Sequence, residues 1–393
     1  MKRPPIDAPA SDWLVYGDSL QTTGDPRGEL VSLSHAVAEG KASADVRDAL
    51  VERHAEAVLG PAIAAKRAAY RFGWKYCLLD SVEIRVTRDD DAGELVGAVL
   101  KSPAAEELRE LVIVGVGNGV NLAKAVYELE VERVPPRLSS IALVDETAAK
   151  ASMLVSRDFD PGANLVALGP LQGLWKLPLQ HLRLEVADAH QVELGTIDAP
   201  ELRSFTLRDL RFGEGPDVIG ALERANMPKL EELELRLVEE FGANIVAEDN
   251  PYVPVYSDDE DFEDRYDEAE DGENYNPIDW TQLEGLLRKL RDLPLRRLAL
   301  TSFDNWESLL ETIGRVGLPR TLKELDLSDS SFDEAAAAWV TKHPELVRHL
   351  ERLVIERVSL DDPARLALLA KVGPQIVHSS DGAPTYRYVV GSE

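Results

Sequence analysis

One short apolar pattern recurs nine times along this 393-residue chain. Each copy carries a large apolar side chain at its first, fourth and sixth positions. The step from one copy to the next is 23 to 30 residues, apart from two longer steps of 41 and 65 residues. The copies begin at Leu79, Leu108, Leu138, Leu179, Leu202, Leu230, Leu295, Leu322 and Leu350.

The spacing within each copy predicts a β-strand. Successive side chains of a strand point to opposite faces, so positions four and six share one face and positions five and seven share the other. A single copy leaves its apolar face uncovered, whereas stacked copies bury that face between neighbours. Each fully buried aliphatic side chain contributes roughly 1.5–3 kcal/mol, so we expect the copies to be stable only as a continuous stack.

Apolar residues at helical spacing lie between the copies. They predict helices over residues 120–130, 284–293, 305–316 and 334–343, and Ser102-Pro103 predicts the start of a further helix. The steps of 41 and 65 residues predict insertions or degenerate copies.

The copies resemble leucine-rich repeats, and a strand plus a helix in about 28 residues resembles the ribonuclease-inhibitor subtype of that repeat. The resemblance implies an α/β fold, a horseshoe-shaped solenoid with parallel inner strands and outer helices. We assign residues 76–373 to this leucine-rich repeat domain.

Residues 1–75 lack the pattern and predict helices over residues 11–24, 28–40, 44–60 and 63–71. The run Gly24-Asp25-Pro26-Arg27-Gly28-Glu29 predicts a turn at its two glycines, with a backbone restricted by the proline. This run resembles the repeat-companion domain that precedes leucine-rich repeats in a family of bacterial proteins. The resemblance extends to Leu14, Tyr16, Asp18, Leu20 and Leu33, while Gly17 and Ser19 stand where that family has Ala and Trp. It implies a small all-α N-terminal domain that caps the array in a bacterial protein, and it implies no activity.

Residues 374–393 contain two alternating apolar runs around Ser380-Asp381-Gly382, which predict a hairpin. The last strand of a solenoid leaves an open edge. We therefore expect this hairpin to cap the array.

The formal net charge is −28, and residues 239–273 hold fifteen acidic residues against the single Arg265. This segment predicts an acidic insertion over about residues 240–278, within the step of 65 residues. Like charges at this density repel, so one interpretation is a solvated loop without a fold. The other is an arm that steers and anchors a basic protein partner through Tyr256, Asp258, Asp259, Glu260, Asp261, Phe262 and Tyr266.

The recurring pattern is here called the template. Side chains at template positions five and seven point away from the predicted core and form the expected partner-binding surface on the concave strand face. The candidates are Glu83, Arg85, Val112, Val114, Val144, Arg183, Glu185, Arg208, Glu234, Arg236, Asp326 and Glu356. With Ala142, the three valines predict an exposed apolar patch that marks a contact, or that the N-terminal domain covers by folding back. The charged residues either pair with one another along the sheet or bind the partner.

Composition narrows the ligands and the compartment. Cys77 is the only cysteine, which excludes an internal disulfide or a cysteine-based zinc site and fits a reducing compartment. The first residues lack the apolar run of a secretory signal, and no stretch approaches the ~18 apolar residues of a membrane span. No cluster of Lys and Arg stands out for nucleic acid. We expect a cytoplasmic protein that binds no membrane, nucleic acid, metal or cofactor.

Motifs for catalysis are missing from the sequence. Residues 115–119, GVGNG, depart from the G-x-G-x-x-G spacing, and the seven histidines are scattered. We therefore expect no enzyme, but a monomeric, non-catalytic scaffold or adaptor that binds a protein partner, including a basic one. An inhibitor or immunity-type protein that neutralises a basic enzyme is the alternative, and an enzyme of unrecognised type is the third.

Overall fold

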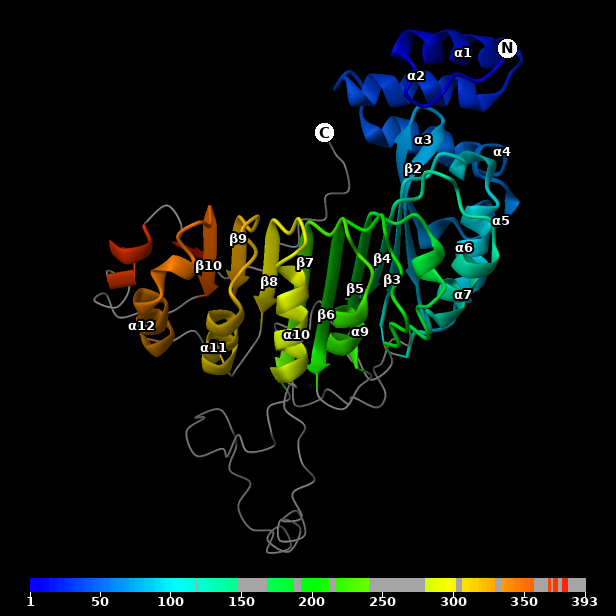
Figure 1. The fold of residues 1–393 in the computed structure, drawn as a ribbon. Coiled ribbons are helices and arrows are strands. Elements are labelled where there is room, and N and C mark those ends of the chain that lie inside the picture. Colours follow the sequence, from blue (N-terminus) through cyan, green and yellow to red (C-terminus); the bar gives the residue numbers. More distant parts are fainter. Residues whose placement is uncertain are drawn as a thin grey trace, which may run out of the picture.

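The computed structural model describes residues 1–117, 119–146, 168–186, 192–212, 217–239, 280–301, 306–328, 334–356, 367–368, 370–373 and 377–380. Within these residues, eleven strands form one sheet in chain order from β1 to β11. β1 is antiparallel to β2, and every later strand is parallel to its predecessor. The repeat helices cover one face of this sheet (Figure 1). The predicted leucine-rich repeat solenoid is confirmed.

Each of the nine apolar copies forms a strand. Every template residue at positions one, four and six is buried, with no exposure above 4%. The fourth positions are in register from strand to strand, so that Val82 pairs with Leu111 and Leu111 with Ile141. The strands are β2 (Leu78–Val86), β3 (Glu110–Gly115), β4 (Ser140–Asp145), β5 (His181–Val186), β6 (Ser204–Phe212), β7 (Glu232–Glu239), β8 (Arg297–Thr301), β9 (Glu324–Leu327) and β10 (Arg352–Glu356).

Both long steps between copies are insertions that add no strand to the described sheet. β4 pairs directly with β5, and β7 pairs directly with β8. Residues 147–167 and 240–279, which occupy most of the two insertions, lie outside the described residues.

The outer face carries α6 (Ala92–Leu100), α7 (Ala123–Val131), α9 (Val218–Arg224), α10 (Trp280–Leu290), α11 (Trp306–Val316) and α12 (Glu334–Lys342). The helices predicted over residues 120–130, 284–293, 305–316 and 334–343 are thus confirmed with small shifts at their ends. The helix predicted to start at Ser102-Pro103 is wrong, because only the 3-10 turn η2 (Pro103–Ala105) forms there. β3 begins at Glu110 and leaves no room for a helix, and α6 has already crossed the outer face before Ser102.

The N-terminal segment folds into α1 (Ala10–Thr22), α2 (Pro26–Ala38), α3 (Ala44–Arg53), α4 (Ala55–Leu59), α5 (Pro61–Ala65), the 3-10 turn η1 (Arg67–Ala69) and β1 (Tyr70–Lys75). The prediction of an all-helical segment over residues 1–75 is therefore wrong at its end. Tyr70 pairs with Ile84 and Phe72 with Val82, so β1 extends two apolar rows of the repeat core. Pairing with β2 stabilises β1 as a strand, and β1 in turn covers the edge of β2.

Close packing of α1 on α2 depends on a pair of glycines. A Cβ atom added at Gly28 would lie 2.5 Å from the backbone oxygen of Gly17. The predicted role of Gly28 in a turn is therefore wrong, because Gly28 lies inside α2. The turn belongs to Gly24, whose φ is +75°, and Asp25 then caps α2 by accepting a hydrogen bond from the Arg27 backbone N–H at 3.0 Å.

The turn between β1 and β2 joins the sheet to the N-terminal helices. Tyr76 in this turn has a φ of +58° and stacks on Trp13 of α1, with ring centroids 4.6 Å apart. Trp13 is fully buried and donates a hydrogen bond from Nε1 to the Pro5 carbonyl at 3.0 Å. α1 and α2 consequently lie beyond the end of the sheet that carries this turn (Figure 1).

At the other end of the array, β11 (Val377–Ser380) pairs in parallel with β10, Val377 opposite Leu353. The first run of the predicted C-terminal hairpin is thus one more parallel strand. The second run, within residues 381–393, lies outside the described residues. None of the described helices has the length and apolar character needed to cross a bilayer.

Candidate partner-binding surface

The face of the sheet opposite the repeat helices is here called the concave face. Parallel register places equivalent template positions in rows across the strands. The fifth-position row runs through Glu83, Val112, Ala142, Arg183, Thr206, Glu234, Ala299, Asp326 and Val354. The twelve candidate partner-binding residues all lie in this row or in the seventh-position row beside it.

A third row on the same face is missing from the predicted surface. Position three lies two residues before position five, so its side chain shares the concave face. The period-two alternation of each strand is the signal that identifies this row. It contains Ser81, Glu110, Ser140, His181, Ser204, Glu232, Arg297, Glu324 and Arg352.

Side chains of alternating charge form a continuous chain of ion pairs from β5 to β10, here called the charge ladder. The expected pairing of charges along the sheet is therefore present. Its contacts are Arg183–Glu185 at 2.8 Å, Arg208–Glu185 at 3.0 Å, Arg208–Glu234 at 2.6 Å, Arg297–Glu234 at 2.9 Å, Arg297–Glu324 at 3.1 Å, Arg297–Asp326 at 3.5 Å and Arg352–Glu324 at 3.5 Å.

Glu234 is the central acid of the charge ladder. Only 8% of the residue is exposed, and its two carboxylate oxygens accept hydrogen bonds from Arg208 and Arg297. Burial alone would raise the pKa of Glu234, but the charges and hydrogen bonds of the two arginines outweigh it and hold that pKa below its usual value. Glu234 therefore stays ionised inside the sheet surface.

The apolar concave patch is not exposed, so that expectation is wrong. Val114 is 1% exposed, Ala142 7% and Val144 0%, and with the partly buried Val112 they form a small apolar cluster of their own. Register pairs these side chains across β3 and β4. In addition, Arg85 on β2 reaches Glu146 just after β4, at 2.8 Å, and this ion pair spans β3.

The concave face is hollowed beside this cluster, towards the amino ends of the strands. The hollow, here called the concave pocket, has a volume of about 450 Å³ and is lined from β1 to β6. Val112 and Ala142 supply apolar surface, and Ser140, Ser204 and Thr206 supply hydroxyl groups. Its charged lining residues are Arg71, Glu83, Glu110 and Arg183.

Glu110 differs from the other charged residues of the concave pocket. Within the described residues, no hydrogen bond or ion pair engages its carboxylate. Burial, and to a smaller extent the charge of Asp80, raise the pKa of Glu110 above its usual value, and Arg109 and Arg183 only partly oppose this. Ionising Glu110 in the folded protein therefore costs more free energy than ionising a glutamate in water.

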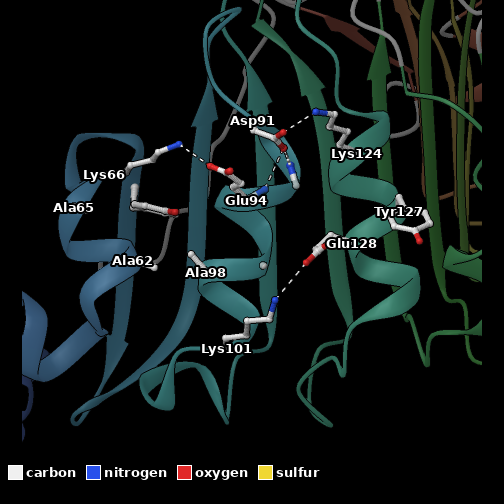
Figure 2. Close-up of a pocket in the computed structure, with 13 residues that line it drawn as sticks. Ala62, Ala65, Lys66, Asp91, Glu94, Ala98, Lys101, Lys124, Tyr127 and Glu128 are labelled. Carbon is white, nitrogen blue, oxygen red and sulfur yellow. Dashed lines mark hydrogen bonds and ion pairs between the residues drawn. The ribbon is translucent and has the colours of Figure 1, made fainter.

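The outer face has a larger hollow of about 760 Å³ between α5, α6 and α7, here called the convex groove (Figure 2). Asp91 and Lys124 point toward each other across it, with a distance of 2.6 Å between their charged atoms. The other charged lining residues pair as well, Lys66 with Glu94 at 3.3 Å and Lys101 with Glu128 at 3.6 Å. The charges of the convex groove thus neutralise one another, whereas Glu110 in the concave pocket has no such partner among the described residues.

Other predicted features contribute no site to the described structure. The acidic insertion lies outside the described residues, and so do its candidates Tyr256, Asp258, Asp259, Glu260, Asp261, Phe262 and Tyr266. In the part of the chain that is described, no group of three or more His, Cys, Asp or Glu side chains is arranged to hold a metal ion. Burial raises the pKa of the Cys77 thiol to about 11, so this thiol stays protonated at neutral pH.

Comparison with known proteins concerns the fold. No family model matches the sequence, and no curated protein is similar to it. A solved structure of a protein from Bacteroides fragilis covers 76% of this chain and 74% of its own, with a TM-score of 0.52 and 15% identity. The leucine-rich repeat-containing protein LegL7 from Legionella pneumophila covers 76% of this chain and 84% of its own, with a TM-score of 0.39 and 11% identity. At 15% identity, the first likeness shows a shared fold alone.

Proposed function

We propose that this protein is a non-catalytic scaffold or adaptor that binds a protein partner on its concave face. The observation that carries the proposal is the concave pocket, into which six neighbouring strands direct side chains of mixed chemistry. Specific protein interfaces combine an apolar centre with polar groups around it. Val112 and Ala142, bordered by hydroxyl groups and by Glu110, provide that combination.

Absence of catalysis is part of this proposal. Ser140 and His181 are direct register neighbours on β4 and β5. A serine nucleophile requires a hydrogen bond to its general base. No such bond joins these two side chains within the described structure, which argues against a hydrolase at the concave pocket.

The alternative function is neutralisation of a basic enzyme, as an inhibitor or immunity-type protein. The formal net charge of −28 favours it, because a strongly acidic protein accelerates its encounter with a basic one. The acidic insertion supports the same alternative as a steering arm.

Several finer assignments accompany the proposal. We propose that the repeats are of the ribonuclease-inhibitor subtype and that the N-terminal helices form a cap of the repeat-companion type. The covering of the β2 edge by β1 supports the capping role. The proposed protein is a cytoplasmic monomer without nucleic acid, membrane or cofactor among its ligands.

The test is affinity capture from the native cell followed by measured binding of the captured protein. Thr206→Trp fills the concave pocket, and Tyr127→Ser alters an exposed residue of the convex groove as the matched control. We expect the concave variant to lose the partner and the convex variant to keep it. Equal affinity of both variants would refute binding at the concave face.

Salt dependence separates the two functions. Tight one-to-one binding that weakens steeply with salt favours the inhibitor, and weak multivalent binding favours the adaptor. Deletion of residues 248–276 tests the acidic arm. If that deletion leaves the affinity and the association rate at low salt unchanged, the arm has no role in binding.

A further inference from the structure

Two arginines and two glutamates line the concave pocket, and three of these four side chains form ion pairs within the described residues. Arg71 pairs with Glu83 at 3.5 Å, and Arg183 pairs with Glu185 at 2.8 Å. Within the described residues, this leaves the carboxylate of Glu110 without a partner. Of these four side chains, Glu110 is thus the one without an ion pair in the described structure, and both arginines are engaged by acids.

A cation would relieve the cost of keeping Glu110 ionised. A partly buried carboxylate without an ion pair or hydrogen bond is unfavourable, and an opposite charge within hydrogen-bonding distance offsets this penalty. Arg109 does not serve this purpose, because it donates two hydrogen bonds to Asp80, at 2.6 and 2.5 Å. Arg183 acts on Glu110 through its charge but pairs with Glu185, so a cationic ligand would add the direct contact that Glu110 lacks in the described structure.

The surroundings of Glu110 specify the shape of that ligand. Ser140 is the register neighbour of Glu110, and its hydroxyl oxygen offers a further acceptor. Val112 and Ala142 stand two residues further along the same strands and are register partners of each other. Carboxylate and hydroxyl acceptors thus lie beside a short apolar wall, which matches a side chain with an apolar stem and a cationic head.

We propose that the concave pocket binds a lysine or arginine side chain of a protein partner, with the cationic group on Glu110 and the stem along Val112 and Ala142. This inference rests on the proposed concave-face function and names the chemistry of the partner. The pocket volume of about 450 Å³ is that of a ligand site, for which roughly 300–1,000 Å³ is typical. The net charge of −28 favours the approach of a basic partner.

The test uses small probes of the two side chains and methyl NMR of the full chain. Nα-acetyl-lysine methylamide and Nα-acetyl-arginine methylamide are titrated against the protein, with the uncharged norleucine analogue as a control. We expect saturable shifts of the Val112 and Ala142 methyl signals with the cationic probes. The norleucine probe should bind at least tenfold more weakly.

Two variants test whether the carboxylate of Glu110 binds the cationic probes. Glu110→Gln removes the carboxylate and should weaken binding of the cationic probes at least tenfold. Glu232→Gln is the matched control, because Glu232 occupies the same template position on β7 but does not line the pocket. Wild-type affinity in Glu110→Gln, equal binding of the norleucine probe, or the absence of saturable shifts would each overturn the proposal.

A measurement on the wild-type protein tests the proposal without depending on the folding of a variant. The carboxyl carbon signal of Glu110 reports its titration, and a bound cation should lower the pH at which that signal titrates. An unaltered titration would contradict the proposal. If Thr206→Trp abolishes capture of the partner while Glu110→Gln keeps full affinity, the cation pocket fails and the concave-face function stands.

Discussion

Neutralising Glu234 should destabilise the sheet, although the residue lies on the concave face, on the opposite side of the sheet from the repeat helices. In Glu234→Gln the side chain keeps its shape, but the ion pairs to Arg208 and Arg297, at 2.6 and 2.9 Å, are lost. The sign of the effect follows from the pKa. Because the pKa of Glu234 lies below its usual value, the attraction of the arginines exceeds the penalty of burial.

The size of this effect lies between two limits. Exposed ion pairs contribute about 0–1 kcal/mol, and breaking a fully buried pair costs about 3–5 kcal/mol. Glu234 is nearly buried, but the side chains of Arg208 and Arg297 are 32% and 31% exposed, so water screens part of the attraction. Both arginines also retain other acids of the charge ladder. We therefore expect a loss of about 1–3 kcal/mol in the free energy of unfolding.

Urea denaturation at two pH values measures the loss. A group with a depressed folded pKa stabilises the protein above its unfolded pKa, and this stability disappears as the pH falls through the folded pKa. The difference between Glu234→Gln and the wild type should thus be full at pH 7 and vanish in strong acid. Glu232→Gln, on the same strand but exposed, is the control. Equal stability of Glu234→Gln and wild type at pH 7, or a difference that persists in strong acid, would refute the reasoning.

Three further predictions concern burial, backbone contact and titration. Val144→Asp places an unpaired charge at a site with 0% exposure and should lower the free energy of unfolding by roughly 3–5 kcal/mol. Thermal melting measures this loss, and an unchanged melting temperature would show that the apolar cluster opens to solvent. Gly28→Ala pushes a methyl group to 2.5 Å from the Gly17 oxygen and should cost about 1–3 kcal/mol, with wild-type melting as the contrary outcome. Glu110→Gln should stabilise the protein at pH 7, because a raised folded pKa means stability that is full below the unfolded pKa and lost as the pH rises through the folded pKa. Urea midpoints that coincide at pH 7 would contradict the raised pKa.

Repeat strands are predictable from sequence because one local rule determines them. Side-chain alternation and the three apolar template positions identify β2 to β10 and their common core. β1 escapes this rule because it lacks the template and follows a run of helices directly. Tyr70 and Phe72 adopt a strand through pairing with Ile84 and Val82, which is a tertiary interaction.

Candidate site residues are predictable in position but not in environment. Alternation correctly places Val114 and Val144 on the concave face, yet it does not specify what covers them. Glu110 and Arg297 occupy the third-position row. Side-chain alternation also places this row on the concave face, but the sequence prediction considered only positions five and seven. In the described part of the chain Glu234 is paired and Glu110 is not, and this contrast depends on which residues neighbouring strands supply at equivalent positions.

The charge ladder restricts how the array can lengthen or shorten. From β5 to β10 the ladder passes through Glu185, Arg208, Glu234, Arg297, Glu324 and Arg352, whose charges alternate in sign, and it also contains Arg183 on β5 and Asp326 on β9. Excising the β8 unit would remove Arg297 and set Glu234 opposite Asp326, two like charges at the same position of neighbouring strands. Loss of that one repeat is therefore disfavoured by the charges on the surface of the sheet.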